Sequence, residues 1–144
     1  MQAIRSGRTQ RAKCLIRLGV DVNTYDGGVT PLIEAVRWGD YSIAKRLLQS
    51  GAQVNLARKT DGFTPLMVAI NGQHTREIDL LLRWNADVAF VSKTHTSAIL
   101  LARRKLDDVY VHRLERALVR QAKHLHPTMP SQVPPRLMGR QRSK

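Results

Sequence analysis

The chain has 144 residues, of which 42% are hydrophobic and 24% charged, a composition that suits one folded domain and excludes a fibrous or wholly disordered chain. Its formal net charge is +13, and residues 119–144 contain six Lys or Arg and no acid, which favours acidic proteins, nucleic acid or anionic lipid as partners. One cysteine, Cys14, excludes an internal disulfide and a CxxC motif and favours a reducing compartment.

The N-terminal segment shows no secretory signal, and no apolar run approaches the roughly 20 residues of a membrane helix. Its first twenty residues contain five basic and no acidic residues, as a mitochondrial presequence would. We expect no presequence, because the same residues fit a repeat. "LIRLGVDVN" from Leu15 is the first copy of a phrase that returns twice, and it places Cys14 on the second helix of a partial first unit, about residues 1–25.

Two further units, about residues 26–59 and 60–92, contain "VTPLIEAVRWGD" from Val29 and "FTPLMVAINGQH" from Phe63, 34 residues later. Each phrase predicts a helix, because Thr is a good N-cap and Pro suits the first helical turn. The apolar residues that follow recur at helical spacing and form one face. Alanines stand where two helices must approach closely.

A second helix completes each unit after a short turn at Gly39 or near Gly72. Its apolar residues again fall on one face, as in "LLQSGAQVN" and "LLRWNADVA", so neither helix can bury its apolar side alone and neighbouring units must stack. The second helices are predicted to end at residues that tolerate the left-handed conformation: Gly19, Gly51 and Asn85.

The last unit, about residues 93–126, begins with the degenerate phrase "SAILLA" at Ser97 and continues as a long basic helical stretch. A solenoid needs an end with a polar outer face, so this unit is interpreted as a C-terminal cap. After it, residues 127–144 are rich in Pro, Ser and basic residues, which predicts a disordered basic tail. The basic residues expected on the outer face of the cap are Arg103, Arg104, Lys105, Arg113, Arg116 and Arg120.

These phrases resemble the ankyrin repeat. The family pattern "G-x-T-P-L-H-x-A-A" appears as residues 28–36 and 62–70, and "L-L-x-x-G-A-D-V-N" as residues 47–55 and 81–89. The resemblance covers about residues 1–118 and implies an all-α solenoid of about four stacked helix-turn-helix units over residues 1–126, the first partial and the last degenerate. Three residues depart from the pattern: Ile33 and Met67 replace His, and Glu77 stands where an apolar residue is usual.

The sequence assembles no catalytic site, so we expect a protein that is not an enzyme and has no cofactor, metal or small-molecule substrate. The histidines are scattered over different units, whereas a catalytic triad must converge in one pocket. His74 falls in an inter-helix turn where the family often has His, and we interpret it as structural. Asp108 and His112 are four residues apart, but no third metal ligand is near in sequence. Cys14 is interpreted as an inert, semi-buried thiol.

The resemblance implies that partners bind a concave surface made by finger-like turns and the first helices. Trp and Arg are frequent binding hot spots, and Trp38 beside Arg37 suits an acidic peptide with an apolar anchor. The alternative is that Trp38 packs on the neighbouring finger at Phe63. Trp84 is interpreted as packing between units. Transferred position by position, the candidate partner-binding residues are Arg5, Tyr25, Val29, Arg37, Trp38, Arg58, Lys59, Asp61, Phe63, Asn71, Lys93, His95, Arg104 and Lys105.

We therefore predict a non-catalytic protein-protein interaction module, a scaffold or adaptor, which binds an acidic or amphipathic segment of another protein and is monomeric by itself. One alternative is electrostatic attachment to nucleic acid or an anionic membrane through the basic cap and tail. A third reading, encouraged by the partial first unit, is an ankyrin fragment of a larger enzyme, channel or ubiquitin-ligase adaptor. We expect a cytoplasmic or nuclear location.

Overall fold

The repeats form a stack of helices in the computed structural model, which describes the backbone of residues 2–125 and the side chains of residues 10–124. Within that range, extended pairing is limited to two isolated bridges, Asp26 with Val29 and Val91 with Ser97. The predicted all-α fold is confirmed; the predicted tail, residues 127–144, lies outside the described residues. The helices are α1 (Gln2–Leu18), α2 (Pro31–Arg37), α3 (Tyr41–Gln49), α4 (Pro65–Asn71), α5 (Thr75–Arg83), α6 (Ala98–Lys105) and α7 (Asp108–Leu125).

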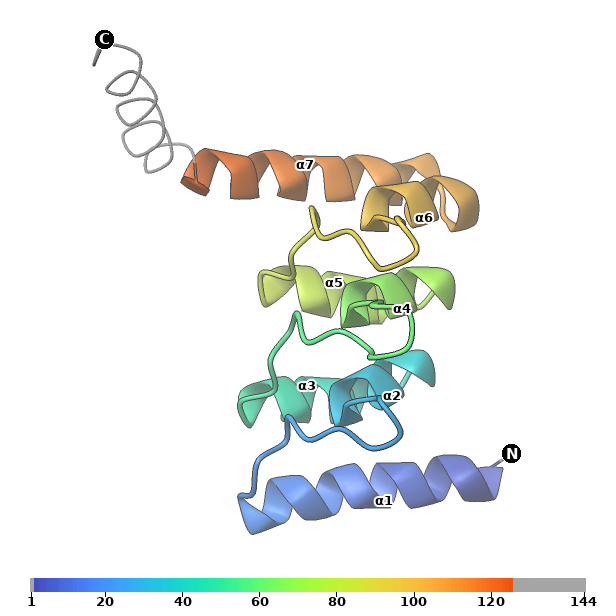
Figure 1. Cartoon of the computed structure of the whole chain (residues 1–144), viewed down its shortest axis with the longest axis vertical. Coiled ribbons are helices and arrows are strands. Elements are labelled where there is room, and N and C mark those ends of the chain that lie inside the picture. The colour runs from blue at the N-terminus through green and yellow to red at the C-terminus, as the bar shows by residue number, and fades with distance from the viewer. Residues whose placement is uncertain (1, 126–144) are drawn as a thin grey trace, which may run out of the picture.

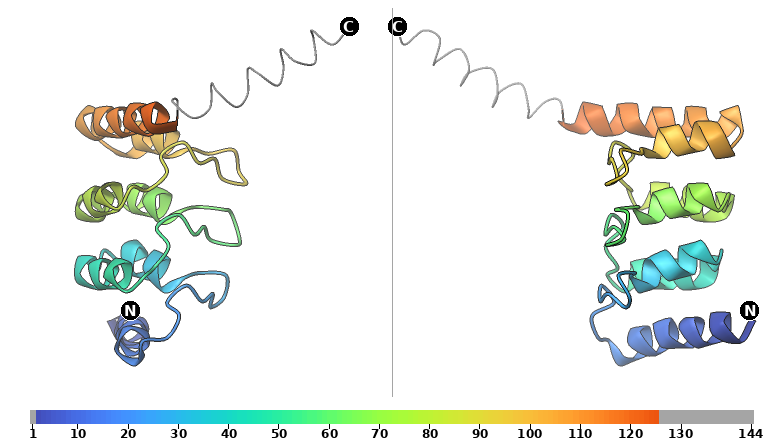
Figure 2. Two further views of the ribbon diagram at one scale, coloured as in Figure 1. Left: turned by 90° about the vertical axis from the view of Figure 1, so that its left-hand side faces the viewer. Right: turned by 45° about the vertical axis from the view of Figure 1, so that its right-hand side comes forward.

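Consecutive helices pair, and the pairs stack in chain order next to α1 (Figure 1). α2 packs on α3, α4 on α5 and α6 on α7, and α4 also packs on both α2 and α6. Figure 2 shows α2, α4 and α6 as an inner row, α3, α5 and α7 as an outer row, and the connecting loops projecting beyond the inner row as fingers. No helix in the described range combines the length and apolar character needed to span a bilayer.

The inner helices begin where the Thr-Pro phrases predict. The hydroxyl of Thr30 accepts a hydrogen bond from the backbone N–H of Ile33 at 3.3 Å, and Thr64 caps α4 through Met67 in the same way. Ser97 caps α6 through the N–H of Leu100 at 3.2 Å, so the degenerate phrase keeps the capping function of Thr. The predicted N-caps are confirmed, and each satisfies a donor that the first helical turn leaves free.

The predicted ends of the outer helices are also confirmed. Gly19, Gly51 and Asn85 have φ of 66°, 98° and 61°, the left-handed conformation that lets the chain leave the helix. Of the three, only Asn85 has a side chain, which Asn tolerates in this conformation better than most residues. The backbone N–H of the next residue then returns to the helix, as Ala86 does to the carbonyl of Leu81 at 3.0 Å.

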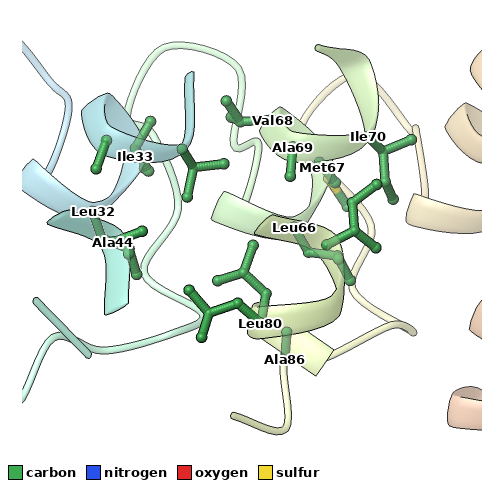
Figure 3. Packing of buried hydrophobic residues seen from close by; sticks show 14 of the residues in the cluster. Leu32, Ile33, Ala44, Leu66, Met67, Val68, Ala69, Ile70, Leu80 and Ala86 are labelled. Atoms are coloured by element: carbon green, nitrogen blue, oxygen red, sulfur yellow. The ribbon is translucent and has the colours of Figure 1, made fainter. Parts of the chain in front are cut away.

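The core is continuous from one unit to the next (Figure 3). Leu47, Leu81 and Leu114 occupy corresponding places in the three outer helices and are fully buried. Ile33 and Met67, which replace the family's His, are also fully buried, so apolar packing takes the place of a polar contact. This shared burial is what makes neighbouring units depend on each other.

The first unit differs from its prediction. Residues 2–18 form the single helix α1 rather than two helices separated by a turn. In the second unit the turn at Gly39 is followed by Asp40, whose carboxylate caps α3 by accepting from the N–H of Ile43 at 3.2 Å. The first unit has Arg8 in the place of Asp40, which cannot accept that bond, so one contribution that favours a new helix start is missing there.

The last unit has a polar outer face, but its composition differs in part from the prediction. Arg103 and Glu115 form an ion pair of 3.2 Å that joins α6 to α7. The residues at the equivalent positions of the second unit, Val36 and Leu48, are apolar and buried. Arg113 and Arg120 are not part of that face: Arg113 pairs with Asp79 of α5, in the preceding unit, and Arg120 lines a hollow together with residues of α5. The Arg113 side chain points toward α5 because its position in α7 is equivalent to that of the buried Leu80 in α5.

Candidate partner-binding surface

The predicted concave surface consists of three fingers and the inner helices beside them (Figure 2). Residues 25–29, 58–63 and 93–95 lie in the fingers. Arg37, Asn71, Arg104 and Lys105 lie at the C-terminal ends of the inner helices, where they are exposed. Arg5 lies in the N-terminal part of α1, and its side chain is outside the described residues. Thirteen of the predicted residues can therefore be placed.

Each finger is shaped by a tight turn. Asp26 and Val29 exchange backbone hydrogen bonds of 2.9 and 3.1 Å around Gly27 and Gly28, whose φ values of 59° and 82° are accessible to glycine without strain. In the next finger, Arg58 N–H donates to the carbonyl of Phe63 at 2.9 Å. The turns present short loops at the tip of the surface.

Neighbouring fingers are joined to one another through the backbone. Lys59 N–H donates to the carbonyl of Gly28 at 2.9 Å, and Lys93 N–H donates to that of Asp61 at 3.0 Å. The Lys93 ammonium also donates to the carbonyl of Lys59 at 2.6 Å. The Tyr25 hydroxyl donates to the carbonyl of Ala57 at 2.7 Å. These bonds make a ladder that runs along the finger tips and fixes the spacing of the units.

Arg58 and Asp61 hold the middle finger. The guanidinium donates from Nε to Oδ1 of Asp61 at 2.9 Å and makes a second bond to Oδ2. This hydrogen-bonded pairing lowers the pKa of the Asp61 carboxyl below its ordinary 3.8 and raises the pKa of Arg58. The Arg58 guanidinium also lies over the Phe63 ring, 5.4 Å from its centroid. Six of the predicted finger residues thus contact other parts of the fingers: Tyr25, Arg58, Lys59, Asp61, Phe63 and Lys93.

Trp38 caps the C-terminal end of α2 and is half-buried. Its indole N–H donates to the Glu34 carboxylate at 3.0 Å, and the Arg37 guanidinium lies 5.8 Å from the ring centroid. The inter-helix turn of the next unit supports this corner, because a ring nitrogen of His74 lies 3.1 Å from the carbonyl oxygen of Arg37. The structural interpretation of His74 is confirmed. Trp38 thus contacts Glu34 and Arg37 of α2, and it lines a small recess together with residues of α1 and α3.

A hollow of about 350 Å³ lies beside Arg37, where α1, the first finger and α2 meet. Val29 and Arg37 were predicted to contribute to the surface and do line it. Sequence reasoning missed Arg11, Asp26 and Glu34, because their contribution depends on how α1 packs on the next unit. Arg11 pairs with Asp26 across the hollow.

The surface carries an excess of positive charge. Its three acidic residues already contact basic groups: Asp26 meets Arg11, Asp61 meets Arg58, and Glu34 lies 4.0 Å from Arg37. Arg104 and Lys105 form no ion pair within the described residues, and all eleven acids of the sequence fall in that range. Arg104 and Lys105 can therefore attract a negatively charged segment without first losing an ion pair.

Two other predicted residues lie outside this surface. Trp84, interpreted from sequence as packed between units, is 41% exposed at the C-terminal end of α5. Cys14, interpreted as semi-buried, is exposed on α1. No group of three or more His, Cys, Asp or Glu side chains within the described residues is arranged to hold a metal ion.

Comparison with known families gives two matches. The family model described as "Ankyrin repeats (3 copies)" matches residues 1–58, and the model described as "Ankyrin repeat" matches residues 61–93. Together they cover more than half of the chain.

Several curated proteins share this sequence pattern. The chain is 36% identical over 94 residues to Rabankyrin-5 of Mus musculus, covering 56% of the chain and 8% of that protein. It is 35% identical over 71 residues to 2-5A-dependent ribonuclease of Homo sapiens, covering 49% and 10%. It is 33% identical over 91 residues to Probable E3 ubiquitin-protein ligase XBOS32 of Oryza sativa subsp. japonica, covering 61% and 18%. The chain thus corresponds to less than a fifth of each of these relatives.

Proposed function

Because this chain belongs to the ankyrin-repeat family, whose repeats generally serve protein interaction, we propose that it is a non-catalytic scaffold or adaptor that binds an acidic or amphipathic segment of another protein on its finger and inner-helix surface. We also propose that it acts in the cytoplasm or nucleus. The relatives include a ribonuclease and a probable ubiquitin-protein ligase, so what they share with this chain is the repeat rather than an activity.

One observation carries the proposal: the inner row is basic, and the acids nearby are already engaged. Arg37 is half exposed beside the Trp38 ring, and Arg104 with Lys105 continues the positive charge at the end of α6. An acidic side chain would meet the guanidinium of Arg37, and an apolar neighbour would rest against the indole. Arg and Trp are the residue types in which binding energy most often concentrates.

The test is a pull-down from nuclease-treated lysate at two salt concentrations, with Arg37→Glu/Trp38→Ala compared with the wild type. We expect at least one protein to be retained by the wild type at both salt concentrations and lost from the double variant. Arg46→Glu, an exposed position on α3 in the outer row, makes the same charge change away from the surface and should retain that protein. Thermal unfolding of all three chains checks that they fold.

A different outcome would favour the electrostatic alternative. In that outcome, retention requires nucleic acid or disappears at the higher salt concentration, and Arg37→Glu/Trp38→Ala behaves as the wild type does. In that case the fingers and inner helices do not form the binding surface. Attachment through the basic cap and tail would then explain the result, because long-range charge attraction is weakened by salt.

A further inference from the structure

A second recess lies on the opposite side of the stack, between the outer helices α5 and α7. It has a volume of about 430 Å³, and its walls include Leu82, Arg83, Asn85, Arg120 and His124. A neighbouring hollow of about 320 Å³ shares Asn85 and His124 and extends it to Asn55 and Asp87. We call the two together the outer furrow.

The outer furrow exists because α7 is longer than the helix on which it stacks. α7 has 18 residues and α5 has 9, so the C-terminal half of α7 extends past the end of α5 (Figure 1). Gln121 attaches this extension to the loop after α5: its amide nitrogen donates to the carbonyl of Ala86 at 2.7 Å, and its amide oxygen accepts from the N–H of Val88 at 3.2 Å. The recess beneath the extension is therefore held open by specific bonds.

Positive charge gathers in the outer furrow. Asp79 lies in its wall, but Arg113 pairs with that carboxylate across the two helices. Arg83 and Arg120 form no ion pair within the described residues, which contain every acidic residue of the sequence. A guanidinium presents several N–H groups in a planar fork that matches a carboxylate. Two such groups from different helices point to an anionic ligand.

The shape and the remaining walls favour a peptide over a nucleic acid. The two hollows are contiguous, which suits an extended chain. Leu82 gives an apolar wall, and the amide of Asn85 can hydrogen-bond a peptide backbone. Asp87 stands at the far end, where it would repel an evenly charged phosphate chain but not an apolar or basic residue of a peptide. Trp84, between two lining residues in the sequence, is exposed for an apolar contact.

We infer that the outer furrow is a second docking site, which binds an extended acidic peptide of another protein through Arg83 and Arg120. The occupant comes from another molecule, since residues 126–144 of this chain contain no acidic side chain. The site lies on the outer row, away from the fingers, so an acidic partner could be held there while the inner surface is occupied.

The experiment uses the full chain with Trp38→Phe, which leaves Trp84 as its one tryptophan and makes its emission a report on the C-terminal end of α5, between two lining residues of the outer furrow. The probe is a synthetic peptide, Glu-Glu-Leu-Glu-Glu-Leu-Glu-Glu, titrated at moderate salt. We expect saturable change in Trp84 emission, and Arg83→Glu/Arg120→Glu should weaken binding by at least about tenfold because both charge contacts become repulsive. Lys45→Glu/Arg46→Glu, an equal charge change at exposed positions of α3, should change it by less than about threefold.

Three results would overturn the inference. One is the absence of any Trp84 response to the peptide at millimolar concentration. Another is an equal loss of affinity in the two double variants, which would mean attraction by net charge alone. The third is stronger binding of a single-stranded oligonucleotide of equal charge than of the peptide. Circular dichroism of each variant confirms that it keeps the helical fold.

Discussion

At the scale of single residues, Glu77 is the clearest departure from the repeat pattern. It lies on the buried side of α5 with 4% of its surface exposed, in the register that Ile43 occupies in α3. No hydrogen bond or ion pair of its carboxylate is found within the described residues, where no buried side-chain oxygen lacks a partner, so the carboxylate oxygens reach solvent while the rest of the side chain is buried. The family pattern therefore identifies a position where a longer apolar contact between helices is replaced by a side chain with a polar end.

Glu77→Ile should stabilise the protein by roughly 1 kcal/mol, because it replaces a polar side chain at a buried position with the apolar side chain that the same position holds in α3. Urea unfolding at neutral pH measures the difference in the free energy of unfolding. Lys45→Ile, which puts the same side chain at an exposed position of α3, is the control and should leave the free energy of unfolding nearly unchanged. A loss of stability in Glu77→Ile would show that the carboxylate has a structural role.

Asp61 should make the free energy of unfolding depend on pH, and its pairing with Arg58 decides the sign of that dependence. The hydrogen bond from Arg58 lowers the pKa of Asp61 in the folded protein below 3.8, so the ionised carboxylate stabilises the fold at and above about pH 5. That contribution is lost as the pH falls through the lowered pKa. Asp61→Asn should cost about 1 kcal/mol at pH 7, where the charge-assisted bond is present.

Urea unfolding at pH 7, 5, 4 and 3 checks this expectation. Below pH 5 the wild type should lose more stability than Asp61→Asn, so the two curves of unfolding free energy against pH should converge. Asp107→Asn, at an exposed position with no ion pair in the described range, should run parallel to the wild type. Parallel curves for Asp61→Asn as well would mean that the pairing with Arg58 does not contribute to the pH dependence.

At the scale of elements, the sequence predicts those helix ends that are determined by residues close to them in the chain. Thr30, Thr64 and Ser97 start the inner helices because an N-cap acts within three residues, and Gly51 ends an outer helix for an equally local reason. The single helix α1 was missed because the repeat pattern was carried over to residues that depart from it. A capping acid is one such difference, but α5 begins after His74 without a side-chain cap, so the acid alone does not decide whether a new helix starts.

Candidate sites depend on contacts between units, which sequence alone does not supply. The finger positions were predicted, but the bonds that join Lys59 to Gly28 and Tyr25 to Ala57 cross about 31 positions of the chain and follow from stacking. The outer furrow was missed entirely, because it arises from the unequal lengths of α5 and α7 and from the way Gln121 holds them. The length of α7 could have been estimated from the sequence, but the recess between α5 and α7 could not have been predicted from it.

At the scale of the whole molecule, the polar face of the last unit limits further stacking. The residues of the second unit that are equivalent to Arg103 and Glu115 are Val36 and Leu48, and both are buried. The residue equivalent to Leu100 is Ile33, which is buried as well. Leu100 is 40% exposed on the outer face of the last unit. This face therefore keeps one apolar residue of the repeat, and the ion pair of Arg103 and Glu115 replaces two others. The charges there act against adhesion between copies rather than for stability, because an exposed ion pair contributes only about 0–1 kcal/mol.

Arg103→Ile/Glu115→Leu should therefore leave the chain folded but make it self-associate, because it joins Leu100 into a continuous apolar face of the kind that marks an interaction surface. Sedimentation velocity over a range of concentrations measures the change, with the wild type expected to remain monomeric. The control is Lys45→Ile/Arg46→Leu, which adds the same two side chains to exposed positions of α3, away from the outer face of the last unit, and should associate less. If both double variants associate equally, added hydrophobicity alone explains the effect; if Arg103→Ile/Glu115→Leu stays monomeric, the ion pair is not what keeps copies apart.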